Sequence, residues 1–258
     1  QRDAHMAPAF DDTSDMSANT PAAFRMAPAI SDVSDMNADL LLVPIPTISA
    51  VDNYSFFSIA SNDSHAATAF GAAATDRLVF VAISAAKSNA PGVTSVTIGG
   101  VSATKAVGVL RTDSLTIISE IWWALVPTGT TGTVVINFAL DQISASVAVY
   151  RVTGMNTTTP INGTNTANVA SGAISAAVTP PSGYSATIAT ALLGFNSTDP
   201  TITWTNATED YENYGGVSLF ESEGFAHRLD TSSPGSTTIT PAVSSADLDP
   251  VKCSAIAC

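Results

Sequence analysis

Carboxylates, serines and histidines are the side chains in this sequence that could perform acid–base or nucleophilic chemistry. Glycosidase-type hydrolysis needs two carboxylates close together, and such groups occur at Glu209, Asp210 and Glu212 and again at Glu221 and Glu223. Acidic residues in an acidic β-protein are usually solvated rather than catalytic. A secreted glycan-cleaving enzyme is therefore the least favoured of three hypotheses.

A Ser–His–Asp triad is the second chemistry to consider, because it can be assembled from distant positions in any fold. Ser64, His65 and His227 are its available members, but serine is so abundant here that the match carries little information. The sequence lacks the G-x-S-x-G elbow, the phosphate loop, the G-x-G-x-x-G turn and the H-E-x-x-H zinc helix. We expect no enzymatic activity, no catalytic residue and no cofactor.

The cysteines and histidines form no zinc-ligand spacing, so no metal site is predicted. Cys253 and Cys258 fall in a segment that reads as a strand, where residues five apart point to opposite faces and stand roughly 16 Å apart. That distance exceeds the reach of a disulfide. We expect small buried or terminal thiols, and an intersubunit disulfide is the alternative.

Two sets of aromatic residues are candidates for binding. Trp122 is predicted on the outer face of a strand beside Glu120, and Trp204 with Tyr211 and Tyr214 forms a second set. An exposed indole flanked by hydrogen-bonding groups suits stacking on a sugar ring. An outward aromatic residue is more often an interface anchor. Trp122, Glu120, Trp204 and Tyr211 are therefore candidates for a glycan site or an interface.

The elements that must position these residues are β-strands. Period-two alternation is clearest over 133–139, where Val134, Ile136 and Phe138 share one face. The same test on 115–126 places Ile117, Ile121 and Trp123 inward, with Leu115 and Leu125, and leaves Thr116, Ile118, Glu120 and Trp122 outward. Outward Ile118, Trp122 and Val126 form an apolar stripe, which predicts self-association.

The remaining candidate strands are short apolar runs bounded by Gly, Pro, Asn, Asp and Thr. They are 54–60, 77–85, 93–98, 106–110, 146–152, 173–178, 185–192, 201–204, 217–221, 237–240 and 251–257. The two glycines in Ile98-Gly99-Gly100-Val101 accept the positive φ angles of a tight primed turn and predict a hairpin. About a dozen strands with turns every 8–12 residues or so predict an all-β fold, a two-sheet β-sandwich or jelly roll.

Composition limits the partners. The chain has 258 residues, of which 45% are hydrophobic and 12% charged, with 9 Lys and Arg against 22 Asp and Glu, a net charge of -13. No basic patch can be assembled, so nucleic acid is not an expected partner. No uninterrupted apolar run approaches about 18 residues, and the first residues do not read as an intact signal peptide. We expect a soluble protein that does not insert into membranes.

Residues 1–40 differ from residues 41–258 and are predicted to form an extended N-terminal arm on the β-sandwich body. MAPAFDDTSDMSA and MAPAISDVSDMNA repeat there at a spacing of 20 residues. One hypothesis is a flexible acidic tether; the other is a duplicated docking peptide that orders on binding its partner. The predicted docking residues are Met6, Phe10, Asp12, Asp15, Met16, Met26, Ile30, Asp32, Asp35 and Met36.

Three segments carry a resemblance to a known domain: 94–104 (TSVTIGGVSAT), 121–138 (IWWALVPTGTTGTVVINF) and 147–154 (VAVYRVTG). They resemble a β-sandwich domain of tailed-bacteriophage virion proteins, such as fibre, spike and decoration components. The similarity covers most of 50–258, including Thr-Glu-Asp-Tyr at 208–211, and its motifs specify turns and core positions without a catalytic residue.

This resemblance implies a non-enzymatic structural protein on the virion surface, in a head decoration or fibre or in a tail fibre. Its arm would attach to other virion proteins, its body would be exposed and could contact a host-surface glycan, and the homo-oligomer would be a trimer. A carbohydrate-binding or adhesin module is the main alternative.

Overall fold

The computed structural model describes most of the chain after the arm. Described are residues 45–59, 61–87, 92–111, 116–169, 176–178, 184–195, 202–214, 221–230, 237–243 and 248–258. Residue contacts divide the chain into Gln1–Val43 and Pro44–Cys258, and the second unit contains every described strand. The predicted docking residues of the arm lie outside the described residues, as do Leu115 and all of the predicted strand 217–221 except Glu221.

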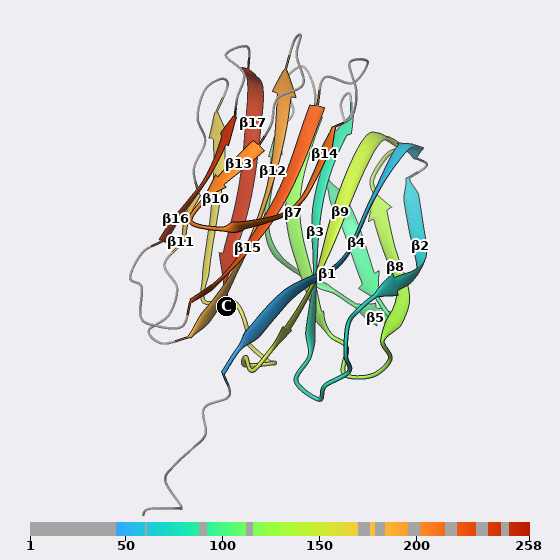
Figure 1. Cartoon of the computed structure of the whole chain (residues 1–258). Coiled ribbons are helices and arrows are strands. Elements are labelled where there is room, and N and C mark those ends of the chain that lie inside the picture. Colours follow the sequence, from blue (N-terminus) through green and yellow to red (C-terminus); the bar gives the residue numbers. More distant parts are fainter. Residues whose placement is uncertain are drawn as a thin grey trace, which may run out of the picture. The chain divides into compact units, whose positions relative to one another are not determined.

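The described residues form seventeen strands in four antiparallel sheets and no helix, which confirms the predicted all-β sandwich class (Figure 1). Sheet A has the order β1 (Thr47–Ile59), β9 (Gln142–Thr153), β3 (Leu78–Lys87), β7 (Thr116–Leu125) and β6 (Thr104–Arg111). Sheet B has the order β2 (Asn62–Ala69), β8 (Thr131–Phe138), β4 (Val93–Ile98) and β5 (Val101–Ser102).

The other two sheets come mainly from the second half of the body. Sheet C has the order β10 (Gly163–Val169), β17 (Leu248–Ala257), β12 (Ser185–Phe195), β15 (Glu221–Asp230) and β14 (Thr208–Tyr214). Sheet D has the order β11 (Ala176–Val178), β16 (Thr237–Val243) and β13 (Ile202–Thr205). In the part of the chain that the structure covers, nothing has the helical length and hydropathy of a membrane span.

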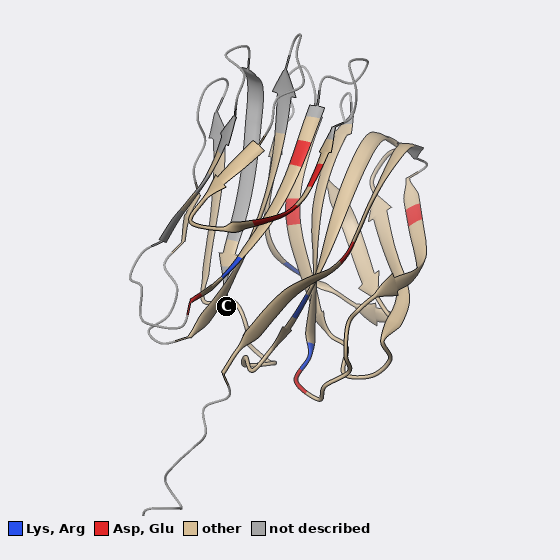
Figure 2. Ribbon diagram, viewed as in Figure 1, with Lys and Arg blue, Asp and Glu red and all other residues tan. Residues whose placement is uncertain are grey.

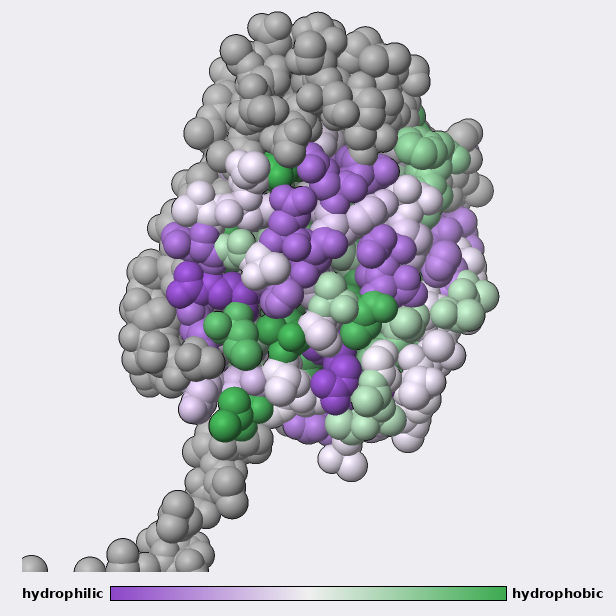
Figure 3. Space-filling model, viewed as in Figure 1, coloured by the Kyte–Doolittle hydropathy of each residue, from purple (hydrophilic) through white to green (hydrophobic). Residues whose placement is uncertain are grey.

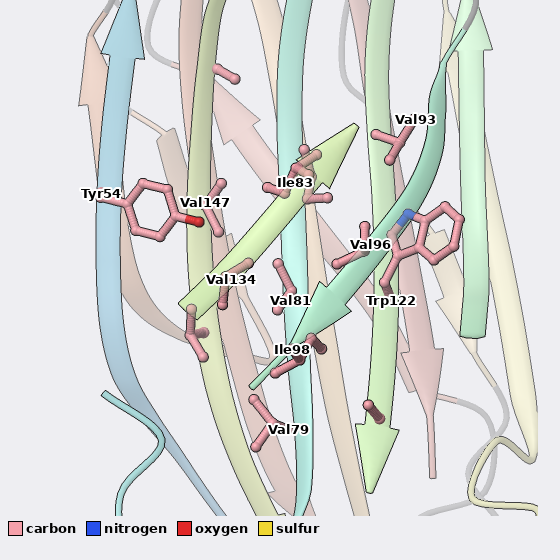
Figure 4. Close-up of a cluster of buried hydrophobic side chains, with 14 of the residues drawn as sticks. Tyr54, Val79, Val81, Ile83, Val93, Val96, Ile98, Trp122, Val134 and Val147 are labelled. Atoms are coloured by element: carbon pink, nitrogen blue, oxygen red, sulfur yellow. The ribbon is translucent and has the colours of Figure 1, made fainter. Parts of the chain in front are cut away.

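The sheets stack as four layers in the order B, A, C, D. One core cluster lies between sheets B and A (Figure 4), a second between A and C, and a third between C and D. On β3, Val81 and Ile83 point into the first cluster, whereas Phe80 and Ala82 point into the second. The central strands are therefore apolar on both faces, as expected for a sheet that is covered on both sides.

Two local predictions are confirmed by the backbone. Gly99 and Gly100 have φ angles of 59° and 81° and join β4 to β5, with Ile98 paired to Val101. This is the primed hairpin that the two glycines indicated. On β8, Val134, Ile136 and Phe138 are buried while the residues between them are partly exposed.

The predicted outer face of β7 is wrong. Trp122 is only 8% exposed and Glu120 only 2%, and both lie on the face that sheet B covers. Ile118 and Val126 belong to the same core, so the apolar stripe from which we predicted self-association is interior. The partner of that stripe is sheet B of the same chain.

Trp122→Ala should be the more damaging of the two adjacent tryptophan truncations. Trp122 fills the core between sheets A and B and donates a hydrogen bond to Glu120, and removing a buried Trp typically costs about 3–5 kcal/mol. Trp123 is half-buried against the A–C core, so Trp123→Ala should cost less. Chemical denaturation of both variants measures the difference; an equal or reversed order would contradict this account of β7.

Candidate functional site

The histidines and the predicted nucleophile are not brought together. His227 on β15 has its Nδ1 2.7 and 2.8 Å from the two carboxylate oxygens of Asp210 on β14. Ser64 and His65 lie on β2 in sheet B, where the His65 ring stacks on Tyr54 with centroids 3.8 Å apart. Asp210 therefore orients His227 as in a triad, but the proposed serine is on another sheet.

Tyr150 lies beside the Asp210–His227 pair, its ring 6.1 Å from that of His227. Burial raises the pKa of Tyr150 well above its usual value, and the nearby charge of Asp210 raises it further. Tyr150 therefore stays neutral and packs in the A–C core. The pairing of His227 with Asp210 escaped sequence reasoning because a bulge between Glu209 and Tyr211 sets the register.

The three predicted carboxylates of β14 interact: burial raises the pKa of Glu209, and the nearby charges of Glu212 and Asp210 raise it further. Glu212 points toward sheet D, where its Oε1 accepts hydrogen bonds from Ile202 N at 2.7 Å and Ser222 Oγ at 3.3 Å. Glu223 points the other way, into the A–C interface, and Glu209 is exposed. Glu212 and Glu223 therefore do not form the facing pair that a glycosidase requires, and the side chain of Glu221 lies outside the described residues.

Glu223 is a fully buried carboxyl group that links sheets A and C. Its Oε2 accepts hydrogen bonds from Ser146 Oγ at 2.6 Å and Asn213 Nδ2 at 2.9 Å, while its Oε1 has no partner. Burial raises the pKa of Glu223 to about 7, against the opposing effect of these two hydrogen bonds. The group is thus poised to change charge near neutrality, inside a packed layer.

Glu120 and Trp122, the first candidate glycan set, are interior and contact the exposed side chain of Lys105. Lys105 Nζ lies 2.7 Å from Glu120 Oε1, and Trp122 Nε1 donates to Glu120 Oε2 at 2.8 Å. Burial raises the pKa of Glu120, with Lys105 opposing the shift. Neither Glu120 nor Trp122 is accessible to a sugar, because sheet B covers this face.

The second candidate set is also split. Tyr211 stacks on Phe225 at 5.9 Å in the A–C interface, whereas Trp204 packs in the C–D core. The two residues contact opposite faces of sheet C and cannot form one binding surface. The side chain of Tyr214 lies outside the described residues.

Neither cysteine supplies a described site. Cys258 is free and buried, its thiol donates to Ala186 O at 3.2 Å, and burial raises its pKa to about 12. This confirms the predicted buried thiol; the side chain of Cys253 lies outside the described residues. Among the residues that the structure places, no three His, Cys, Asp or Glu side chains could hold a metal ion.

The face over β1, β14 and β15 is largely hydrophilic and carries separate apolar spots (Figure 3). The large exposed apolar residues of the described surface are scattered along the chain, such as Phe57 at 51% and Leu140 at 46%. Single exposed apolar residues are normal on a soluble protein. A concave site is therefore a stronger candidate than an apolar patch.

An open hollow of about 520 Å³ lies at one end of the sandwich formed by sheets A and B. Its walls are the Gly99–Gly100–Val101 turn, the loop 126–129 and the start of β8 at 131–133, with the Phe70 ring beneath them. None of these lining residues is charged. The hollow therefore offers peptide groups, threonine hydroxyls and a small apolar surface.

Glycine is required for this construction. A Cβ on Gly132 would lie 2.5 Å from Cε2 of Phe70, and one on Gly99 would lie 3.1 Å from the same atom. The buried ring thus occupies the space that side chains at these two positions would need. Gly129 also has a positive φ of 72°, which favours glycine in the loop.

Arg77 holds the walls of the hollow from behind. This fully buried side chain donates to Val126 O and Thr128 O at 2.7 Å each, to Gly71 O at 2.8 Å, and more weakly to Phe70 O at 3.4 Å. Burial lowers the pKa of Arg77, with Arg151 adding to the effect. Four carbonyl acceptors satisfy the buried guanidinium and fix both loops.

Sequence reasoning identified the double-glycine hairpin at this site but not the hollow. Its remaining signals are the glycine-rich run PTGTTG at 127–132 and an arginine directly before the apolar run of β3. Comparison with known proteins adds nothing to these signals: no family model, no curated protein and no solved structure matches the chain.

Glu223 should make the stability of the body depend on pH near neutrality. Because its folded pKa of about 7 exceeds the ordinary 4.5, the unfolded chain loses this proton first, and stability falls as pH rises between these values. The full interval corresponds to a loss of roughly 3 kcal/mol. Glu223→Gln, which cannot ionise, should remove this component.

Urea unfolding at pH 5, 6, 7 and 8 measures this effect. Asp141→Asn is the matched control, because that carboxyl is exposed between β8 and β9, and it should keep most of the wild-type pH dependence. The same slope in wild type and Glu223→Gln would show that another group controls the dependence.

Proposed function

We propose that this protein is a non-enzymatic structural protein on the surface of a tailed-bacteriophage virion, as a decoration or fibre component. Residues 1–40 attach it to other virion proteins, and the β-sandwich body is exposed. The resemblance of three sequence segments to domains of such proteins supports this proposal, and the arrangement of those segments in the fold adds to that support.

The observation that carries the proposal is that the three segments form one structural unit. Residues 94–104 contain most of β4 and the β4–β5 hairpin, 121–138 run from β7 into β8, and 147–154 lie in and after β9. β4 pairs with β8, and β3 joins β7 to β9. The segments therefore supply much of the core between sheets A and B and the walls of the hollow.

The positions of the carboxylates that were candidates for catalysis agree with a structural role. Glu120 and Glu223 are engaged inside layers, and Glu212 and Asp210 bind partners on different sides of sheet C. Buried polar groups with good partners fix how sheets pack. We do not extend the proposal to glycan cleavage, because Glu212 already accepts two hydrogen bonds and Glu223 is buried in the A–C interface.

Immunolabelling tests the location directly. An antibody raised against residues 41–258 should decorate purified particles in negative-stain electron microscopy, at regular positions on the head or on the tail. Unlabelled particles from a preparation in which the protein is expressed would overturn the proposal. Labelling of host membranes or of free protein alone would also overturn it.

Deleting residues 1–40 should prevent the folded body from joining particles, because the duplicated peptide is the proposed anchor. Two linked peptides can raise avidity by about 10²–10⁴ without tight binding by either, so deleting residues 6–25 alone should give partial occupancy. The acidic repeats should make attachment weaken with added salt. Quantitative gels of purified particles measure occupancy. Normal occupancy by the protein that lacks residues 1–40 would show that the body carries the attachment surface.

A further inference from the structure

The outer face of sheet B differs from the rest of this acidic protein in carrying no charge. Strands β4, β5 and β8 contain no Asp, Glu, Lys or Arg, and β2 contains only Asp63. In Figure 2, β4, β5 and β8 are accordingly tan, and β2 carries a red segment, which is Asp63. Asp63 shares its side of β2 with His65, which stacks on the buried Tyr54, so it belongs to the inner face. A protein with net charge -13 thus keeps one sheet face neutral.

Side chains on this face are held in place by hydrogen bonds across three strands. Asn62 Nδ2 on β2 donates to Asn137 Oδ1 on β8 at 2.5 Å, and Asn137 Nδ2 donates to Ser95 Oγ on β4 at 2.9 Å. Thr94 Oγ1 also donates to Asn137 O at 2.9 Å. The amides are therefore oriented before any ligand arrives, which lowers the entropy cost of binding.

The neutral face leads directly into the hollow at its end. Thr131 and Thr133 of β8 belong to both. The volume of about 520 Å³ lies within the range of about 300–1,000 Å³ that is typical of small-molecule pockets. The Arg77 hydrogen bonds fix its loops, so the hollow is formed in advance.

The lining selects an uncharged ligand rich in hydroxyl groups. A charged group placed here would lose water and meet no opposite charge among the lining residues, which is costly. Val126, Pro127 and the Phe70 edge provide an apolar base, and threonine hydroxyls with glycine peptide groups provide donors and acceptors at the rim. A neutral sugar ring has a matching apolar C–H face and a hydroxyl edge.

We propose that the outer face of sheet B and the glycine-walled hollow at its end bind an uncharged oligosaccharide of the host surface. That the sugar belongs to a host rests on the proposed function, which exposes the body on the particle. The site is not the aromatic one that the sequence suggested; it uses backbone, hydroxyl and amide groups in place of Trp122 and Trp204.

Binding of the full-length protein to immobilised polysaccharides tests the proposal. The probes are three uncharged polymers, dextran, mannan and galactan, with dextran sulfate as the anionic contrast. We expect binding to at least one uncharged polymer, little change with added salt because no ion pair is involved, and no preference for dextran sulfate. Failure of all three uncharged polymers, or binding of the sulfated polymer alone, would overturn the proposal.

Three variants locate the site. Thr131→Glu introduces a negative charge at the exposed rim of the hollow. Asn62→Asp introduces a negative charge among the hydrogen-bonded side chains of the outer face, with almost no change in side-chain shape. Each should weaken binding by at least about tenfold, while Thr205→Glu, an exposed position on β13, should bind like wild type. Thermal unfolding shows whether each variant is folded. Wild-type affinity in folded Thr131→Glu would exclude the hollow.

These experiments distinguish failure of the oligosaccharide site from failure of the proposed virion function. Thr131→Glu leaves the arm unchanged and should reach particles at normal occupancy. Labelled particles combined with no uncharged-polysaccharide binding would refute this inference alone. Binding that maps to Thr131 and Asn62, combined with unlabelled particles, would support the site and refute the virion role.

Discussion

Burial of both faces of sheets A and C is the constraint on which the rest of this structure depends. Side chains along the middle of β3, β7, β9 and β12 must fit into one of two layers, and each polar one needs a partner there. Ser84 Oγ meets Thr190 Oγ1 at 2.7 Å across the A–C interface, and Glu223 meets Ser146 beside it. The A–C interface is thus crossed by a hydrogen-bonded band, with the large A–C core on one side of it and a small apolar cluster of Ala86, Ile117 and Leu192 on the other, which specifies how the two sheets align.

Strands were easier to predict from the sequence than layers. The predicted positions of β4, β8 and β17 agree with the structure because their apolar runs end at clear turn residues. One face of β7 was predicted to be exposed to solvent. Ile118 and Trp122 on that face are apolar, as are Ile117 and Ile121 on the opposite face. Apolar residues on both faces are the pattern of a strand that is covered on both sides. β14 and most of β15 were missed, since their inward residues include Asn213, Glu223 and His227 and do not read as a core.

The candidate site could not be predicted for a different reason. Aromatic side chains drew attention to Trp122 and Trp204, yet large rings gain most by burial, and the layers take them. The hollow depends on two residues without side chains. Gly99 and Gly132 leave room for the Phe70 ring, which packs beneath the walls. A backbone-lined site has little sequence signature beyond glycine spacing. The Arg77 hydrogen bonds that stabilise it reach carbonyl groups 49 and 51 positions further along the chain, so local sequence does not reveal them.

The placement of charge explains why sheet B can remain neutral. Edge strands expose backbone groups that invite pairing with other chains, and charged residues there oppose it. On β14, an edge of sheet C, Glu209 is exposed and supplies this protection, whereas Asp210 and Glu212 bind His227 and Ile202. On β1, an edge of sheet A, Asp52 accepts hydrogen bonds from Asn53 N and from Ala69 N of β2. Glu209 and Asp52 thus place acidic groups at edges of the two central sheets, where pairing with a strand of another chain would disturb the layers. Edge protection does not require charge on the outer face of sheet B, so that face is free to carry hydroxyl and amide groups, which are the groups that the proposed uncharged ligand would need.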